Sequence, residues 1–134
     1  MKKFCFVVMA LAWLPSAALA ADAQGDWLVA DRSAVIRVSG CGNALCGVIA
    51  WTREPGRDEH NPDPSRRNRS IVGVPILLGM KPSAAGRWDG TIYNPQNGKT
   101  YTGHLILKSA DVLRIEGCVL GGIFCGGETW RRSK

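Results

Sequence analysis

Short runs of β-branched, aromatic and alternating apolar residues, separated by turn signals, recur along the chain from residue 26 to residue 132. Between them, no stretch keeps an apolar residue every three or four positions for long enough to predict a helix. Short runs at this spacing are typical of an all-β sandwich or barrel. We therefore expect about eight strands, at residues 26–30, 34–39, 45–52, 74–80, 87–94, 99–108, 111–118 and 123–132.

Most connections between these runs are short, which favours antiparallel neighbours in meander order. Asn97-Gly98 is a strong hairpin signal, because both residues tolerate the positive φ angles that tight turns need. We predict a small eight-stranded antiparallel up-and-down barrel, which removes its own sheet edges, with a two-sheet sandwich as the alternative. Glycines inside the runs indicate bends or bulges where the sheet curls: Gly47, Gly90, Gly103, Gly117, Gly126 and Gly127.

Residues 1–20 have the three parts of a secretory signal peptide. Lys2 and Lys3 precede an apolar stretch from Phe4 to Leu14, which is too short to span a bilayer, and Ala18-Leu19-Ala20 forms a cleavage pattern. We predict cleavage after Ala20, which leaves one soluble domain at residues 21–134, periplasmic or secreted from a bacterium. A retained membrane anchor is the alternative for the leader, and no other apolar run is long enough to cross a membrane.

The cysteines also favour an exported chain. Cys5 leaves with the signal peptide, and the even number that remains indicates two disulfides, with three possible connectivities. We favour Cys41–Cys46 and Cys118–Cys125, because each pair brackets a glycine-containing turn and would close one hairpin. Their spacing fits a zinc ribbon poorly, so we predict no metal site.

The formal net charge is +6, and three arginines gather between residues 66 and 69. A modest positive balance raises the chance of an anionic partner, such as an envelope protein or a cell-wall polymer. A nucleic-acid partner is not expected, because no basic face is interleaved with aromatic residues. We also expect no cofactor.

The longest connection, residues 58–73, reads DEHNPDPSRRNRSIVG. Its oxygen-bearing side chains could ligate calcium, but the alternating D-x-D-x-D-G order of a calcium loop is absent. Two prolines fix much of the backbone. We expect the acidic side chains to accept hydrogen bonds from backbone amides or arginines and to pin the connection, with a ligand or partner contact as the second possibility. The candidate residues are Asp58, Asn61, Asp63, Arg67 and Arg69.

Catalytic patterns are weak in this sequence. His60 lies in the long connection and His104 on a predicted strand, so each is interpreted as a polar surface residue. No serine stands in a nucleophile-elbow context. Glu116 and Glu128 lie on strands that can be neighbours, but we expect an ordinary surface pair. We therefore predict no catalytic residue and no enzyme, and rank a hydrolase last.

Gly25-Asp26-Trp27 opens the predicted domain, and Trp130-Arg131-Arg132 closes it. In a closed meander the first and last strands are neighbours, so Arg131 or Arg132 can lie over the indole of Trp27 and plug one end of the barrel. This arrangement resembles the lipocalin and calycin superfamily, in which an early G-x-W tryptophan packs under a late arginine. The role that the resemblance implies for these residues is structural.

Five further stretches span nearly the whole predicted domain: Leu45-Cys46-Gly47; Asp58-x-x-Asn61-Pro62-Asp63 with Arg67-x-Arg69 and Gly73; Trp88-x-Gly90-x-Ile92-Tyr93-Asn94-Pro95-x-Asn97-Gly98-Lys99-x-Tyr101; Leu113-x-Ile115-x-Gly117-Cys118; and Thr129-Trp130-x-Arg132. Together they resemble a family of small exported bacterial proteins known as domain of unknown function 2147. The resemblance implies a calycin-like barrel and no particular activity.

A curled sheet with one plugged end has a concave, water-poor site at its open end. Eight strands are at the threshold between a filled barrel and one that holds a small molecule. We predict a non-enzymatic protein that binds a small apolar or amphipathic ligand there. The alternative is an envelope interaction module that docks through the basic loop at residues 66–69 on an anionic polymer or protein. The candidate ligand residues are Ile49, Trp51, Trp88, Ile92, Tyr93 and Leu105.

Overall fold

The computed structural model describes residues 22–133, so the predicted signal peptide and its cleavage site lie outside the described residues. None of the helices in that range is long and apolar enough to span a bilayer. Two 3-10 turns, η2 (Pro64–Arg66) and η3 (Leu120–Gly122), lie in connections. The strands are β1 (Gly25–Leu28), β2 (Ala34–Cys41), β3 (Ala44–Thr52), β4 (Pro75–Ala84), β5 (Arg87–Asn94), β6 (Lys99–Ser109), β7 (Val112–Val119) and β8 (Phe124–Arg132).

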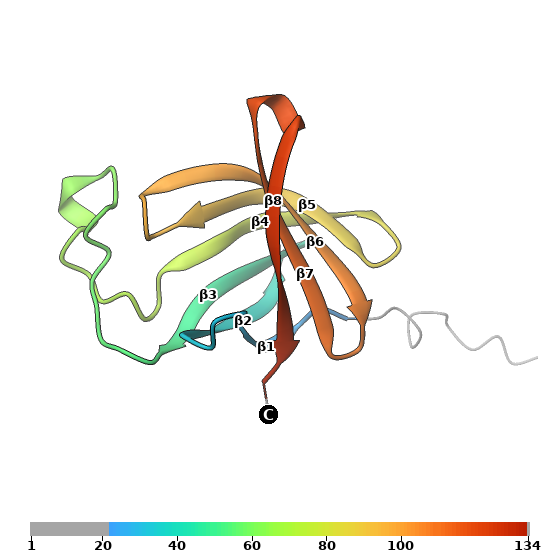
Figure 1. Cartoon of the computed structure of the whole chain (residues 1–134), viewed down its shortest axis with the longest axis horizontal. Helices are drawn as coiled ribbons and strands as arrows, with labels where there is room; N and C mark the ends of the chain where they lie inside the picture. Colours follow the sequence, from blue (N-terminus) through green and yellow to red (C-terminus); the bar gives the residue numbers. More distant parts are fainter. Residues whose placement is uncertain (1–21, 134) are drawn as a thin grey trace, which may run out of the picture.

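Each strand pairs antiparallel with the next, and β1 also pairs with β8, so the sheet closes into a barrel (Figure 1). The predicted up-and-down barrel is confirmed, and the sandwich is excluded, because a sandwich would leave open edges on both of its sheets. The seam is short: Trp27 lies opposite Arg132, and Leu28 lies opposite Arg131.

Both predicted disulfides are confirmed. Cys41–Cys46 spans the β2–β3 turn, and Cys118–Cys125 braces the β7–β8 hairpin. In the chain-entropy model, loops this short gain about 2 kcal/mol from each bridge. The β7–β8 hairpin projects beyond the body of the barrel (Figure 1), and its tip is exposed and apolar at Val119, Leu120 and Ile123.

One end of the barrel is plugged by Trp27, whose side chain is fully buried. The guanidinium of Arg132 lies over the indole, with its central carbon 4.3 Å from the ring centroid. Its Nε donates to the carbonyl of Ala110 at 2.8 Å, and its terminal nitrogens donate to the carbonyls of Gln24 at 2.7 Å and Asp22 at 3.1 Å. Arg132 thus joins the β6–β7 turn, the segment before β1 and the end of β8.

Gly25 makes this close approach possible. Its φ is +122°, and a Cβ at this position would lie 2.6 Å from a terminal nitrogen of Arg132. The glycine of the G-x-W motif is therefore needed both for its backbone conformation and for its lack of a side chain. The neighbouring Arg131 is exposed, so Arg132 is the arginine of the plug.

The half of the barrel next to the plug is filled. Leu77, Met80, Leu105 and Leu113 are fully buried there, and Trp88 packs against the same cluster while partly buried. Burial of this apolar surface is the main favourable term in the stability of a domain of this size. The opposite half is not filled in this way.

Candidate functional site

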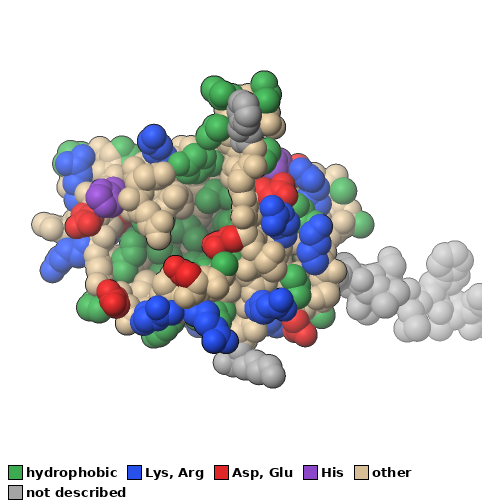
Figure 2. Space-filling view, in the orientation of Figure 1, with side chains coloured by type: hydrophobic (Ala, Val, Ile, Leu, Met, Phe, Trp, Pro, Cys, Tyr) green, Lys and Arg blue, Asp and Glu red, His purple; other side chains and the backbone are tan. Residues whose placement is uncertain are grey.

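The barrel end opposite the Trp27–Arg132 plug opens into a cavity of about 440 Å³, within the range typical of small-molecule sites. Figure 2 shows this hollow beside β8, with apolar side chains inside it and acidic side chains at its rim. Residues of every strand from β2 to β8 line it, because the inward positions of all these strands converge on the barrel axis. Most of the apolar lining consists of isoleucine: Ile36, Ile49, Ile76, Ile92 and Ile115.

Glycines on the β7–β8 wall create much of the space. Gly117 and Gly126 lie opposite each other in register, and both line the cavity. A Cβ placed on Gly126 would meet nothing within 4 Å. The sequence predicted bends or bulges at these glycines, but the pairing of β7 with β8 keeps its register through both of them. Their effect on the cavity is that this part of the wall has no side chains.

One charged side chain, that of Glu128 in β8, lines the cavity. Glu128 lies opposite Ile115 on the inward face, and its Oε1 accepts a hydrogen bond from Nε1 of Trp130 at 2.8 Å. The prediction that Glu116 and Glu128 form a surface pair is wrong. Glu116 lies opposite Gly127, one position along, and alternation places its side chain on the outer face.

Trp51, a predicted ligand residue, lies outside the cavity and is 48% exposed. A β-bulge explains this position. Ile36 pairs with Ile49 and the preceding Val35 pairs with Trp51, so Ala50 is an extra residue in β3. The extra residue reverses the alternation and turns the indole outward.

The other predicted ligand residues divide between the open and the filled halves of the barrel. Ile49, Ile92 and Tyr93 line the cavity. Leu105 and Trp88 pair with each other in the filled half, where neither reaches the cavity. Leu105 and Trp88 face inward, as predicted. They lie closer to the plugged end of the barrel than the cavity does, and so they do not line it.

The long β3–β4 connection is attached to the barrel through Asp58, whose side chain is fully buried. Its Oδ1 accepts a hydrogen bond from the phenol of Tyr93 at 2.6 Å. Its Oδ2 accepts from Nδ2 of Asn61 at 2.8 Å and from Nε of Arg69 at 2.9 Å. Both oxygens have partners within the protein, which is the arrangement of a structural pin.

This pin also fixes the charge states of its members. Burial by itself would raise the pKa of Asp58, but hydrogen bonds from Tyr93, Asn61 and Arg69, with the charge of Arg69, lower it below the ordinary value of 3.8. Burial and the hydrogen bond to Asp58 raise the pKa of Tyr93 to about 12. Since Tyr93 also lines the cavity, the pinned loop and the cavity share one side chain.

The remaining loop candidates bind within the loop itself. Asp63 accepts hydrogen bonds from the backbone and hydroxyl of Ser65 and caps η2. Nε of Arg67 donates to the carbonyl of Asn61 at 2.8 Å, and Nε of Arg66 lies 3.4 Å from Asp63. Much of the basic charge of the loop is therefore balanced internally.

A second hollow of about 590 Å³ lies beneath the loop. It shares Ala34, Ile49, Pro95 and Gln96 with the barrel cavity, so the two adjoin. Its own lining contains charges of both signs, from Arg53, Glu54, Arg57 and Glu59, beside His60.

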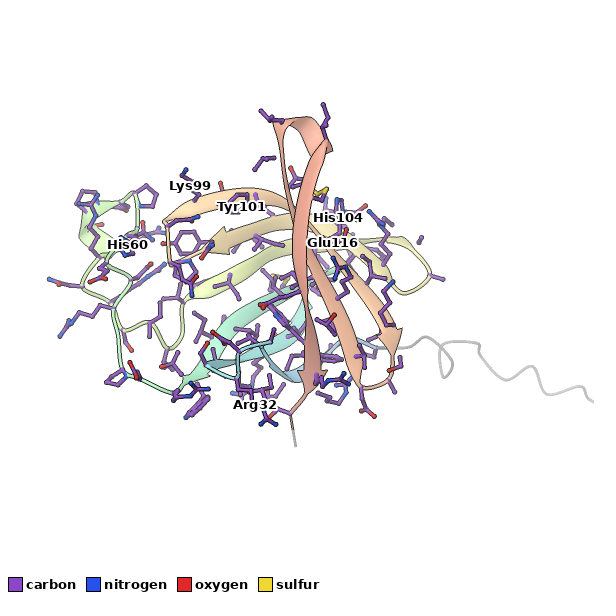
Figure 3. All side chains as sticks on the ribbon, viewed as in Figure 1. Arg32, His60, Lys99, Tyr101, His104 and Glu116 are labelled. Carbon is purple, nitrogen blue, oxygen red and sulfur yellow. A yellow bond between two sulfur atoms is a disulfide. The ribbon has the colours of Figure 1, made fainter. Side chains whose placement is uncertain are left out.

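His104 lies on the outer face of β6, with Nδ1 2.6 Å from Oδ1 of Asp89. Glu116 lies opposite it on β7, and the two are close together in Figure 3. Nε of Arg87 donates to the same oxygen of Asp89 at 3.2 Å. The carboxylate therefore lies between a guanidinium and an imidazole, an arrangement that holds no nucleophile of a hydrolytic triad. Within residues 22–133, no group of three or more His, Cys, Asp or Glu side chains is placed to hold a metal ion.

Comparison with known proteins gives a family and a fold. The family model described as "Uncharacterized protein conserved in bacteria (DUF2147)" matches residues 25–132. Among solved structures, protein HP1028 from the human pathogen Helicobacter pylori, described as belonging to the lipocalin family, matches with a TM-score of 0.76 and 20% identity over 84% of each chain. No curated protein matches the sequence significantly. The structural match shows a lipocalin-like barrel.

Proposed function

The chain belongs to the DUF2147 family of bacterial proteins. We propose that it is a non-enzymatic protein that binds a small apolar or amphipathic ligand in its barrel. The lipocalin-like fold supports a binding role, because barrels of this kind enclose ligand cavities. The two disulfides support a periplasmic or secreted location, where such bonds persist.

One observation carries the proposal: the barrel is plugged at one end and open at the other, where isoleucines surround about 440 Å³. Each Å² of apolar surface that a ligand buries there contributes roughly 25 cal/mol. The lining also carries polar groups near the β5–β6 turn, from Asn94, Gln96 and Tyr101, so a partly polar ligand can also be accommodated.

Filling the cavity tests this function. In Gly126→Phe, the new ring enters the open space beside β7, and the φ of Gly126 does not require glycine. We expect the variant to bind the apolar fluorescent probe N-phenyl-1-naphthylamine at least about tenfold more weakly than the wild type, because the ring occupies the volume that the probe needs. The matched control is Thr129→Phe, at an exposed, outward position of the same strand, which should bind like the wild type.

Circular dichroism and thermal unfolding establish that both variants are folded. Equal probe binding by the wild type and Gly126→Phe would contradict the proposal. Native mass spectrometry of the protein purified from the periplasm should show a bound mass that organic extraction removes. A bare mass, combined with no uptake of the probe, would also contradict the proposal.

The alternative function is docking on an anionic envelope polymer or protein through the loop at residues 66–69. Arg66 and Arg67 are exposed and favour it, although each also has a partner inside the loop. Salt separates the two functions. Loop docking should weaken strongly between 0.05 and 0.5 M NaCl, because salt screens exposed charges, whereas binding of a neutral probe in the cavity should change little.

A further inference from the structure

Glu128 places a carboxylate in the cavity lining, and a purely apolar ligand would have no use for it. It is the charged residue in a lining otherwise made of apolar, aromatic, glycine and neutral polar residues. Its strand position faces inward, between Gly126 and Trp130 on the same face of β8. Departures from the local apolar pattern are expected at functional sites, so this carboxylate needs an explanation.

The carboxylate is oriented but not neutralised. Nε1 of Trp130 donates to Oε1 at 2.8 Å, which restricts the side chain. Within the described part of the chain, no Lys, Arg or His side chain forms an ion pair with Glu128. A carboxylate has about four acceptor sites, so one indole N–H leaves most of this capacity free.

The indole of Trp130 does not explain the charge. The buried indole N–H needs one acceptor, and the neutral oxygen of a glutamine side chain at position 128 would supply it equally well. The hydrogen bond from Trp130 therefore does not require a negative charge at position 128.

The surroundings leave room for a ligand group beside the carboxylate. Gly126 is two positions earlier on the same face, and the space in front of it is open. Glu128 is itself exposed, at the open side of the cavity. A charged head group can therefore pair with it while keeping part of its hydration, and the apolar body of the ligand can lie deeper, among the isoleucines.

We propose that the ligand is an amphiphile with a positively charged head group, a protonated amine or a quaternary ammonium, which pairs with Glu128 while its apolar body packs among the isoleucines. This inference rests on the proposed function and names the class of ligand. Amphiphiles with an anionic head, such as fatty acids, are disfavoured, because their charge repels that of Glu128.

Displacement of N-phenyl-1-naphthylamine by three decyl compounds tests the inference, with the two ionic compounds below their micellar concentrations and the neutral one below its solubility limit. These are decyltrimethylammonium, 1-decanol and decyl sulfate, which share a chain and differ in head charge. For the wild type we expect the cation to bind about three- to fivefold more tightly than the alcohol, as for a solvent-exposed ion pair, and decyl sulfate to bind most weakly.

Glu128→Gln removes the charge and keeps an oxygen that can accept from Trp130. It should weaken decyltrimethylammonium binding about three- to fivefold and leave 1-decanol within about twofold of the wild type. Unchanged decanol binding also shows that the cavity of the variant is intact. The matched control is Glu116→Gln, which removes a carboxylate from the outer face of the neighbouring strand and should alter neither affinity.

The outcomes separate this inference from the function on which it rests. If the wild type binds neither the probe nor 1-decanol, the proposed function fails. If it binds both, but the cation binds no better than the alcohol or Glu128→Gln leaves cation affinity unchanged, only the head-group assignment fails. An equal loss in Glu116→Gln would point to the overall field of the protein and would also overturn the role of Glu128.

Discussion

At the scale of single residues, Asp58 shows how one carboxylate can determine the shape of a long connection. It is fully buried and bound by Tyr93, Asn61 and Arg69. Because its pKa is lowered in the folded protein, its contribution to stability is complete above the ordinary value of 3.8 and is lost as the pH falls through the lowered value. The loop should therefore detach from Tyr93 in strong acid.

Tyr93→Phe tests the partner of this carboxylate. The folded pKa of Tyr93 is about 12, against an ordinary value of 10.0, so the native protein keeps a proton that the unfolded chain loses as the pH rises between these values. Stability contributed by the hydroxyl therefore falls across that window. We expect the variant to be about 1–2 kcal/mol less stable at pH 7 and this difference to shrink above pH 10.

Urea unfolding at a series of pH values measures both quantities. The variant keeps the ring that lines the cavity, so its effect reports the hydrogen bond and not the loss of apolar packing. A stability difference that stays constant from pH 9 to pH 12 would contradict the raised pKa of Tyr93.

At the scale of strands, the closure of the barrel depends on a short contact between β1 and β8. Only the Trp27–Arg132 and Leu28–Arg131 pairs join these strands in register within the described chain. Side-chain contacts of Arg132 supplement this pairing by binding three carbonyls outside β8. The side chain of Arg132 therefore makes more contacts that hold β1 and β8 together than the backbone pairing of these two strands does.

Arg132→Ala should be strongly destabilising, by about 3 kcal/mol, because it removes the contact over Trp27 and leaves three carbonyls without these donors. Arg131→Ala is the matched control one position away, and an exposed side chain of this kind should contribute less than about 0.5 kcal/mol. Urea unfolding midpoints measure both changes. Similar losses in the two variants would refute the plug.

Strand boundaries show a second effect at this scale. The run predicted at residues 74–80 continues as β4 to Ala84, past Pro82, where the register with β5 shifts. The bulge at Ala50 likewise changes which face Trp51 occupies. Turn residues mark where strands end, whereas bulges arise from how a strand fits its neighbours around the curve of the barrel.

At the scale of the whole molecule, the barrel has one filled, plugged half and one hollow half. The apolar residues that fill the first half come from strands on every side of the barrel. The hollow half is bounded by isoleucines, by the glycines of β7 and β8, and by the loop that Asp58 holds in place. The cavity is therefore open to the outside while the core of the filled half stays closed.

Amide hydrogen exchange should reveal this division. Because β1 pairs with β8 over few residues, we expect β1 amides to exchange at least about tenfold faster than those in the centres of β5, β6 and β7, which are paired on both sides. In Arg132→Ala, the loss of protection should spread first along β1 and the end of β8. Equal protection around the whole barrel would contradict a weak seam.

The sequence alone predicted eight strands in meander order, a closed barrel with a sandwich as the alternative, the favoured pairing of both disulfides and the resemblance to the family. These features follow from local signals: alternation, turn residues, paired cysteines and motifs near the two ends of the chain. The sequence also singled out Ile49, Ile92 and Tyr93, which line the cavity. Strand period accounts for Ile49 and Ile92, whereas Tyr93 is the next residue along β5 and is held by its hydrogen bond to Asp58. It did not identify Gly126 or Glu128 as cavity residues, although alternation places both on the inner face of β8 with Trp130.

The packing of the whole barrel sets where the filled half ends and the cavity begins. It placed Leu105 and Trp88 below the floor, turned Trp51 outward, and left Glu128 facing the open space. Each of these outcomes depends on the depth of a residue along the barrel axis or on a bulge, and both are set by how all eight strands fit together around the ring. No single run of residues contains that information.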